Sequence, residues 1–283
     1  MVRSSTAIKK QRTTYLIGTI FIGLTVLVIS LYALSLGSSK KVEINNKTDL
    51  CPKERNHIPA HVVFLIDTTS TIGVAQKAWI EVDIKRTLSE LESYSLVTFF
   101  EVQDNADESA KALLSICLPR RFDPEKDSTF TTGKEFYEKI YREKFAPRID
   151  ERLQTQMESI ERAQSPIFQT LQAIKTNGFD RELLSHSKVP SSGKGTQSRL
   201  IVYSDLLQHD QTFSMFRGIP TYEAFVMTDY GAKSVPQLND VAITINVLQT
   251  RPDIQRQAAY TDFWRRLFAN RGARVTDIRY IPG

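Results

Sequence analysis

The chain has 283 residues, 41% of them hydrophobic, and a formal net charge of +5. This length and apolar content are enough to bury a full core, which excludes a disordered chain as the default. Six of the 37 basic residues precede Glu43, where no acidic residue occurs, and the remaining 31 basic residues face 32 acidic ones. The bulk of the chain is therefore close to neutral, which argues against nucleic acid as the partner.

A long apolar segment follows the basic N-terminal tail, residues 1–14. Residues 15–36 contain no charged side chain, and roughly 20 apolar residues suffice to cross a bilayer as a helix. The competing interpretation is a cleaved signal peptide, whose apolar region is shorter, at about 7–15 residues. We therefore predict one uncleaved transmembrane helix at residues 15–36 and a juxtamembrane linker at residues 37–59.

The flanking charges do not fix the orientation of this helix, because basic residues occur on both sides of it. We predict a cytoplasmic N-terminus, since a first apolar segment with a basic, acid-free tail normally inserts that way. The following domain would then be extracytoplasmic, either periplasmic or extracellular. In such a compartment Cys51 and Cys117 can form a disulfide, whereas in the cytosol they would be small core residues.

Residues 60–283 show the pattern of one α/β domain. The apolar run at residues 62–66 predicts a central strand that is buried on both faces. Further strands are predicted at residues 96–102, 112–118, 199–205, 241–248 and 274–281, and helices at residues 73–94, 163–176, 221–233 and 253–270. The short turn after residue 102 allows only an antiparallel pairing. We predict a doubly wound, mostly parallel sheet with one antiparallel edge strand.

The helical patterns carry further expectations. For residues 73–94 the predicted buried face consists of Val74, Ala78, Val82, Leu88 and Leu91. Residues 119–163 form a helical insertion that Pro147 should divide or kink. Its charged face is either a docking surface or, as is commoner, a solvated outer face. In the last helix, Phe263, Trp264 and Phe268 are predicted to lie in the core and not in an exposed hot spot.

Polar side chains follow the first strand, at the point where its apolar run ends. Asp67, Thr69 and Thr71 alternate through this loop, so they can converge beyond the carboxyl end of the strand, where open α/β sheets bind ligands. Carboxylate and hydroxyl oxygens are hard donors that suit magnesium, manganese or calcium better than zinc or copper. Taken alone, the pattern also fits a turn or a helix cap.

The sequence D-x-T-x-T after an apolar strand resembles the metal-ion-dependent adhesion site (MIDAS) of von Willebrand factor A (vWA) domains, whose usual form is D-x-S-x-S. Ser165, in SPIFQTLQAI, is similar to the family's loop Thr or Ser, and it also suits a helix N-cap before Pro166. Asp205 ends RLIVYSD and resembles the family's strand-end Asp. Leu206 replaces the family's usual glycine, and a positive φ would be costly there.

The resemblance implies a metal site formed by Asp67, Thr69, Thr71, Ser165 and Asp205. A Mg²⁺ ion held by so few charged ligands, or Mn²⁺ or Ca²⁺ in its place, would stay electrophilic enough to accept a carboxylate from a protein partner. The resemblance therefore implies a protein-binding module without catalytic residues, which the predicted transmembrane helix at residues 15–36 would anchor to a membrane. A structural subunit of an envelope complex, in which the metal only stabilises the fold, would have the same ligands.

Two further expectations concern enzymes and cysteines. Phosphotransferases of the haloacid dehalogenase type also begin with an apolar strand and an Asp, but they carry a second Asp where Thr69 stands. No Ser-His-Asp, Cys-His or paired-carboxylate arrangement is readable in the sequence. The predicted topology also places Cys51 and Cys117 at the sheet edge opposite the metal loops, which predicts a disulfide between them.

Overall fold

The computed structural model describes residue 44 and residues 49–54, 57–104, 106–125, 134–157, 162–180 and 197–283. The chain divides into two units, Met1–Val42 and Glu43–Gly283. The first unit lies outside the described residues, and with it the tail and the transmembrane helix predicted for residues 1–36. No helix in the described part of the chain is long and apolar enough to cross a membrane.

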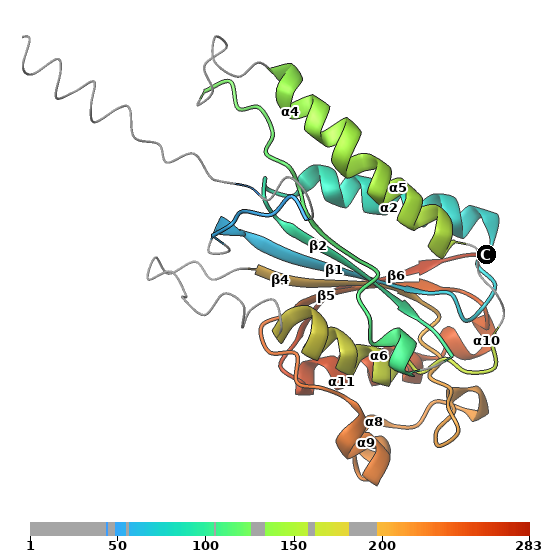
Figure 1. Cartoon of the computed structure of the whole chain (residues 1–283). Coiled ribbons are helices and arrows are strands. Elements are labelled where there is room, and N and C mark those ends of the chain that lie inside the picture. Colours follow the sequence, from blue (N-terminus) through green and yellow to red (C-terminus); the bar gives the residue numbers. More distant parts are fainter. Residues whose placement is uncertain are drawn as a thin grey trace, which may run out of the picture. The chain divides into compact units, whose positions relative to one another are not determined.

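A six-stranded sheet forms the centre of the second unit (Figure 1). Its strands are β1 (Ala60–Asp67), β2 (Leu96–Val102), β3 (Leu114–Cys117), β4 (Gln197–Ser204), β5 (Ala242–Leu248) and β6 (Arg274–Ile281). Across the sheet the order is β3-β2-β1-β4-β5-β6, and all neighbours are parallel except β2 and β3. The predicted mostly parallel sheet with one antiparallel edge strand is confirmed.

The strand order reverses at β1, whose two neighbours in the sheet are β2 and β4. From β1 the chain continues to β2 on one side and later returns to β4 on the other. The loops that leave β1 and β4 therefore diverge at the carboxyl edge of the sheet, and such a divergence is where open α/β sheets bind ligands.

Helices cover both faces of the sheet (Figure 1). One layer contains α2 (Val74–Glu90), α4 (Lys134–Ile140) and α5 (Ala146–Gln156), and the other contains α6 (Ile167–Ala173), α8 (Tyr222–Val226) and α11 (Ala258–Asn270). Short helices complete the fold: α3 (Ala106–Ser109), α9 (Asp229–Ser234), α10 (Pro252–Gln255) and the 3-10 helix Met215–Arg217. Successive side chains of β1 alternate between the two cores, with Phe64 in the first and Leu65 in the second.

The buried face of α2 differs from the predicted one. Val74 and Val82 are 86% and 66% exposed, whereas the buried positions are Gln76, Ile80, Asp83, Ile84, Thr87 and Leu88. Leu88 and Leu91 are buried as predicted, but the prediction was wrong for Val74, Ala78 and Val82, because polar side chains with tertiary partners occupy buried positions on this helix. Asp83 accepts a hydrogen bond from the Tyr203 hydroxyl at 2.8 Å, and Gln76 donates to the Ile281 carbonyl at 3.1 Å.

The insertion forms a helical segment that changes its hydrogen-bonding pattern at the predicted place. A π-helical turn, Tyr141–Phe145, joins α4 to α5 and ends one residue before Ala146 and Pro147. Proline has no N–H to donate, and the regular α-helical hydrogen bonds are replaced by this π turn just before it. Pro147 does not divide the helix, since α4, the π-helical turn and α5 follow one another without a gap, and the predicted irregularity is limited to this change of hydrogen-bonding pattern. Residues 126–133 and 158–161 of the insertion lie outside the described residues.

The aromatic residues of α11 lie in the core, as predicted. Phe263 and Trp264 are each 1% exposed, and Phe268 is fully buried. Trp264 also packs against Phe168 of α6, with 5.6 Å between ring centroids. These contacts join α6 and α11 over the same face of the sheet, beneath the loops that leave β1 and β4.

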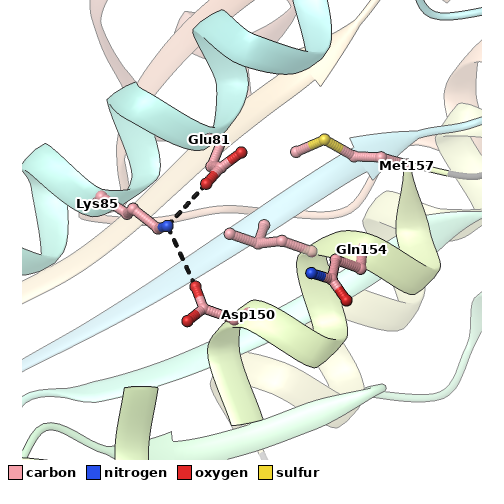
Figure 2. A pocket seen from close by; sticks show the side chains of 6 residues that line it. Glu81, Lys85, Asp150, Gln154 and Met157 are labelled. Atoms are coloured by element: carbon pink, nitrogen blue, oxygen red, sulfur yellow. Dashed lines mark hydrogen bonds and ion pairs between the residues drawn. The ribbon is translucent and has the colours of Figure 1, made fainter. Parts of the chain in front are cut away.

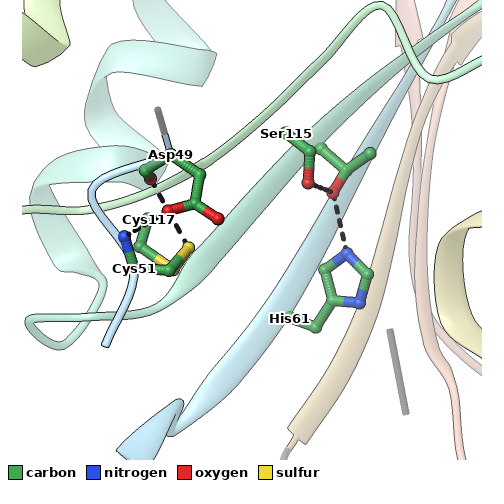
Figure 3. Close-up of a disulfide and its surroundings, with 6 residues drawn as sticks. Asp49, Cys51, His61, Ser115 and Cys117 are labelled. Atoms are coloured by element: carbon green, nitrogen blue, oxygen red, sulfur yellow. Dashed lines mark hydrogen bonds between the residues drawn. A yellow bond between two sulfur atoms is a disulfide. The ribbon is translucent and has the colours of Figure 1, made fainter. Parts of the chain in front are cut away.

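A disulfide joins Cys51 to Cys117 (Figure 3). Cys117 faces Leu96, the first residue of β2, so the bond lies at the amino ends of the parallel strands. The Cys117 N–H donates to the Asp49 carbonyl at 2.8 Å, which adds a backbone link between the segment before β1 and the edge strand. The predicted pairing, and its place opposite the loop of Asp67, are confirmed.

Candidate functional site

Asp67 is the last residue of β1 and is only 3% exposed. Its Oδ1 accepts hydrogen bonds from the Thr69 N–H at 3.0 Å and the Thr69 hydroxyl at 2.6 Å. Its Oδ2 accepts from the Ser204 hydroxyl at 2.6 Å and, at a longer 3.4 Å, from the Ser165 hydroxyl. A carboxylate offers about four acceptor positions, so donors of the protein occupy all of them and fix the orientation of Asp67.

Asp205 directly follows β4 and is also 3% exposed. Its Oδ2 accepts from the hydroxyls of Ser70 at 3.0 Å and Thr250 at 2.9 Å. Its Oδ1 accepts from the Leu207 N–H at 2.9 Å. Ser70 belongs to the loop of Asp67, so its hydroxyl links the loops after β1 and β4. The loop after β1 therefore supplies a hydroxyl donor to each carboxylate, Thr69 to Asp67 and Ser70 to Asp205.

Burial raises the pKa of both carboxyl groups. For Asp67 the loss of hydration outweighs the hydrogen bonds from Ser204, Thr69 and Ser165, which favour the ionised form. For Asp205, burial and the neighbouring charge of Asp67 raise the pKa to about 7. Neither group forms an ion pair with a basic side chain of the described residues. Two buried carboxylates without a counter-charge favour an external cation or a proton.

This arrangement predicts that stability depends on pH in the metal-free protein. Because the folded-state pKa of Asp205 lies above its ordinary 3.8, its contribution is complete below about pH 4 and is lost as the pH rises through about 7. We expect urea unfolding in chelator to show a free energy that falls from pH 5 to pH 8. Asp205→Asn, which cannot titrate, should flatten this fall. Parallel profiles for the two proteins would contradict the prediction.

The loop after Asp205 contains a residue in the left-handed backbone conformation, although this residue is leucine and not glycine. Leu206 has a φ of +51°, and its N–H donates to the Ser204 hydroxyl at 2.8 Å. Its side chain is 1% exposed in the second core. A leucine in this conformation costs on the order of 1 kcal/mol, and burial of the side chain offsets that cost. The loop conformation that the sequence left in question is therefore present.

Ser165 has a different local role from the N-cap that suits its sequence. Pro166 occupies the cap position of α6 and makes no side-chain cap hydrogen bond. The backbone of Ser165 instead pairs with His209 through two hydrogen bonds of 2.8 and 3.0 Å. This pairing joins the loop before α6 to the loop after β4. The Ser165 hydroxyl is therefore left to donate to Asp67.

Four of the five predicted ligands take part in these hydrogen bonds: Asp67, Thr69, Ser165 and Asp205. Thr71 is exposed, and with both aspartates it lines a small pocket that also includes Ser70, Ile72, Leu248 and Thr250. Ser70, Ser204 and Thr250 are further donors that were not predicted from the sequence. Ser204 could have been found from the sheet, because Ile66 pairs with Tyr203 and the next residues, Asp67 and Ser204, are therefore neighbours.

The donor set fits a hard divalent cation. The described residues contain no cluster of three or more His, Cys, Asp or Glu side chains that could hold a metal, so a cation here would depend on hydroxyl oxygens. The hydroxyls of Thr69 and Ser165 supply such oxygens beside Asp67, and Thr71 lines the same pocket as both carboxylates. Hydroxyl and carboxylate oxygens suit Mg²⁺, Mn²⁺ and Ca²⁺, which is the chemistry that the sequence predicts.

A larger pocket, of about 370 Å³, lies between α2 and α5 (Figure 2). In this pocket the Lys85 ammonium donates to Glu81 at 2.7 Å and lies 3.2 Å from Asp150. The three charges bridge the two helices, and Leu153 and Met157 also line the pocket. Lys85 carries one positive charge against the two negative charges of Glu81 and Asp150, and both carboxylates already contact its ammonium.

No family model matches the chain, and no curated protein matches it. Among solved structures it is similar to the TFIIH p34 N-terminal domain, at 13% identity and a TM-score of 0.36 over 77% of this chain and 90% of that one. It is also similar to the conserved hypothetical protein BatB from Bacteroides thetaiotaomicron, at 14% identity and a TM-score of 0.30 over 79% and 90%. Likenesses this weak carry no argument about function.

Proposed function

We propose that this chain is a membrane-anchored binding module of the vWA type, which engages a protein partner through a divalent cation, Mg²⁺ in the first place. The observation that carries the proposal is the pair of buried carboxylates, Asp67 and Asp205, at the ends of adjacent strands. Hydroxyl and amide donors surround them, and no basic side chain of the described residues pairs with them. A cation would supply the missing charge.

The hydrogen bonds suggest which role each residue would have in holding the cation. All acceptor positions of Asp67 are occupied by the protein, so it would orient the hydroxyls of Thr69 and Ser165 toward the cation. Asp205 keeps one acceptor position on Oδ1 beyond the bond from Leu207. A cation held mainly by neutral hydroxyls retains enough electrophilicity to accept a carboxylate from a partner.

The pull-down that tests this proposal uses the full-length chain in detergent. We expect partner capture in millimolar Mg²⁺, loss of capture in chelator, and loss of capture by Asp205→Ala. Asp262→Ala is the matched control, because Asp262 is exposed on α11 and pairs only with Arg266 on the same helix. Capture that survives both the chelator and Asp205→Ala would show that the cation site does not mediate binding.

The structural-subunit alternative is separated from this proposal by stability. If the metal only stabilises the fold, chelator lowers the melting temperature of the protein, and the fraction that remains folded still binds. If the metal mediates binding, chelator removes capture at temperatures where the protein stays folded. The hydrogen bonds that already hold Asp67 without a metal favour the second outcome.

A phosphotransferase is a weaker candidate. The position two residues after Asp67 holds Thr69 in place of a general acid, and its hydroxyl donates to Asp67 itself at 2.6 Å. A carboxylate whose acceptor positions are all engaged is a poor nucleophile. We therefore propose that the chain is not an enzyme. We also propose that residues 60–283 are extracytoplasmic, because the disulfide suits an oxidising compartment.

A further inference from the structure

Gln255, the last residue of α10, has a fully buried side chain that makes four hydrogen bonds. Its Oε1 accepts from the N–H groups of Thr250 at 3.0 Å and Arg251 at 2.9 Å. Its Nε2 donates to the Leu248 carbonyl at 2.9 Å and to the Asp205 carbonyl at 3.1 Å. One amide thus joins the end of β5, the loop that follows it, and the loop after β4.

The loop after β5 delivers a hydroxyl to the candidate cation site. Thr250 donates to Asp205 Oδ2 at 2.9 Å, and the Tyr260 hydroxyl of α11 donates to the Asp205 carbonyl at 2.7 Å. Asp205 is therefore held at its carboxylate by the loop after β5 and at its backbone by α10 and α11. Thr250 and Leu248 also line the small pocket that contains both aspartates.

These contacts determine which oxygen of Asp205 can face a ligand. Thr250 and Ser70 together fill the two acceptor positions of Oδ2, whereas Oδ1 accepts only from Leu207. Without the Thr250 hydroxyl, one restraint on the rotation of the carboxylate is lost, and Oδ2 competes with Oδ1 for the cation. Preorganised ligands bind more tightly because less ordering remains to be done on binding.

We propose that Gln255 is a positioning residue of the cation site and that Thr250 is the hydroxyl it places on Asp205. The proposal adds the loop after β5 to the three loops that the sequence predicts, and it rests on the proposed cation site. Gln255 acts through Thr250 and the Asp205 backbone and does not itself bind the ion. The Gln255 amide holds the loop after β5 in place before any ion binds.

The test is Mn²⁺ calorimetry on the full-length chain in detergent, together with melting temperatures in chelator. Thr250→Val keeps the shape of the side chain and removes the hydroxyl, and it should weaken Mn²⁺ binding about tenfold, as expected for one hydrogen bond to a charged group. Thr250→Ser restores the hydroxyl and should bind like wild type. In chelator, Thr250→Val should melt slightly below wild type, because Asp205 loses one donor, whereas Thr250→Ser should melt like wild type.

Gln255→Glu tests the amide itself, since it keeps an acceptor for Thr250 and loses both donated bonds. We expect Mn²⁺ binding to weaken by more than in Thr250→Val. Gln257→Glu is the matched control, because the Gln257 side chain donates to the Asp253 carbonyl at the surface, and no hydrogen bond among the described residues joins it to the loop after β5 or to Asp205. A folded Gln255→Glu protein that binds Mn²⁺ like wild type would overturn the positioning role of Gln255, and the Thr250 pair separately decides whether the Thr250 hydroxyl contributes to ion binding.

The outcomes separate this inference from the function on which it rests. Wild type that binds no Mn²⁺ at millimolar concentration overturns the proposed function and the inference with it. Wild type that binds Mn²⁺ while Thr250→Val binds equally well overturns the inference alone. A Thr250→Ser variant as weak as Thr250→Val also overturns it, because the hydroxyl would then not be the group that matters.

Discussion

Asp67→Ala is expected to abolish Mg²⁺ and Mn²⁺ binding and partner capture while the protein still folds. The substitution removes the carboxylate that holds Thr69, Ser165 and Ser204 in one network. It leaves the apolar side chains of β1 in both cores intact. Three hydroxyls and one N–H lose an acceptor, which costs stability. The removal of one of two buried like charges offsets part of that cost.

The measurement compares ion affinity by calorimetry with melting temperature, for wild type, Asp67→Ala and Asp262→Ala in detergent. Asp262→Ala should retain both properties, since its partner lies on α11. A folded Asp67→Ala protein that binds Mn²⁺ like wild type would contradict a role for Asp67 in the site. An Asp67→Ala protein that melts early but captures partner with its folded fraction would support the structural alternative.

The strands could be predicted from the sequence because their signal is local. β2 and β6 begin and end where the apolar and alternating runs place them, at Leu96–Val102 and Arg274–Ile281. β1 is buried on both faces, as its unbroken run of apolar residues indicates. Antiparallel pairing of β2 with β3 followed from the length of the connection alone. Each of these features depends only on residues that are close together in the sequence.

The errors occur where a polar side chain has a distant partner. The face of α2 was misassigned because Asp83 is buried against Tyr203, a residue 120 positions away. Thr250 was missed because its acceptor, Asp205, is 45 positions away and on another loop. Ser165 suits an N-cap by its sequence, but pairing with His209 turns its hydroxyl to Asp67. Local sequence propensity does not reveal such contacts, since they depend on tertiary packing.

The sequence revealed those residues of the candidate site that lie at the ends of strands. Asp67 and Asp205 were recognisable because each ends an apolar run that forms a buried strand. Their mutual electrostatic effect was not recognisable, because it requires β1 and β4 to be neighbours in the sheet. The conformation of Leu206 could not be predicted from the local sequence either. Its positive φ is tolerated because the side chain packs into a core that the local sequence does not reveal.

Removal of the Cys51–Cys117 disulfide is expected to lower the free energy of unfolding by about 4 kcal/mol in the chain-entropy model. The bond closes a loop between residues 66 positions apart, and without it the unfolded chain gains the freedom that the loop had lost. It also holds the segment before β1 on β3, which is an edge strand of only four residues. Urea unfolding of Cys51→Ala/Cys117→Ala against wild type measures the difference.

Two controls make this result specific to the covalent bond. Wild type treated with reductant should unfold at the same urea concentration as the double variant, because both lack the cross-link. Only the double variant has altered side chains, so agreement between the two assigns the loss of stability to the covalent bond. Thiol labelling of unreduced, denatured protein from intact cells should find no free thiol. Two labelled thiols would contradict both the bond and the extracytoplasmic placement it supports, since cytosolic thiols stay reduced. A difference below about 1 kcal/mol between oxidised and reduced protein would instead mean that hydrogen bonds such as that from Cys117 to Asp49 hold this edge of the sheet.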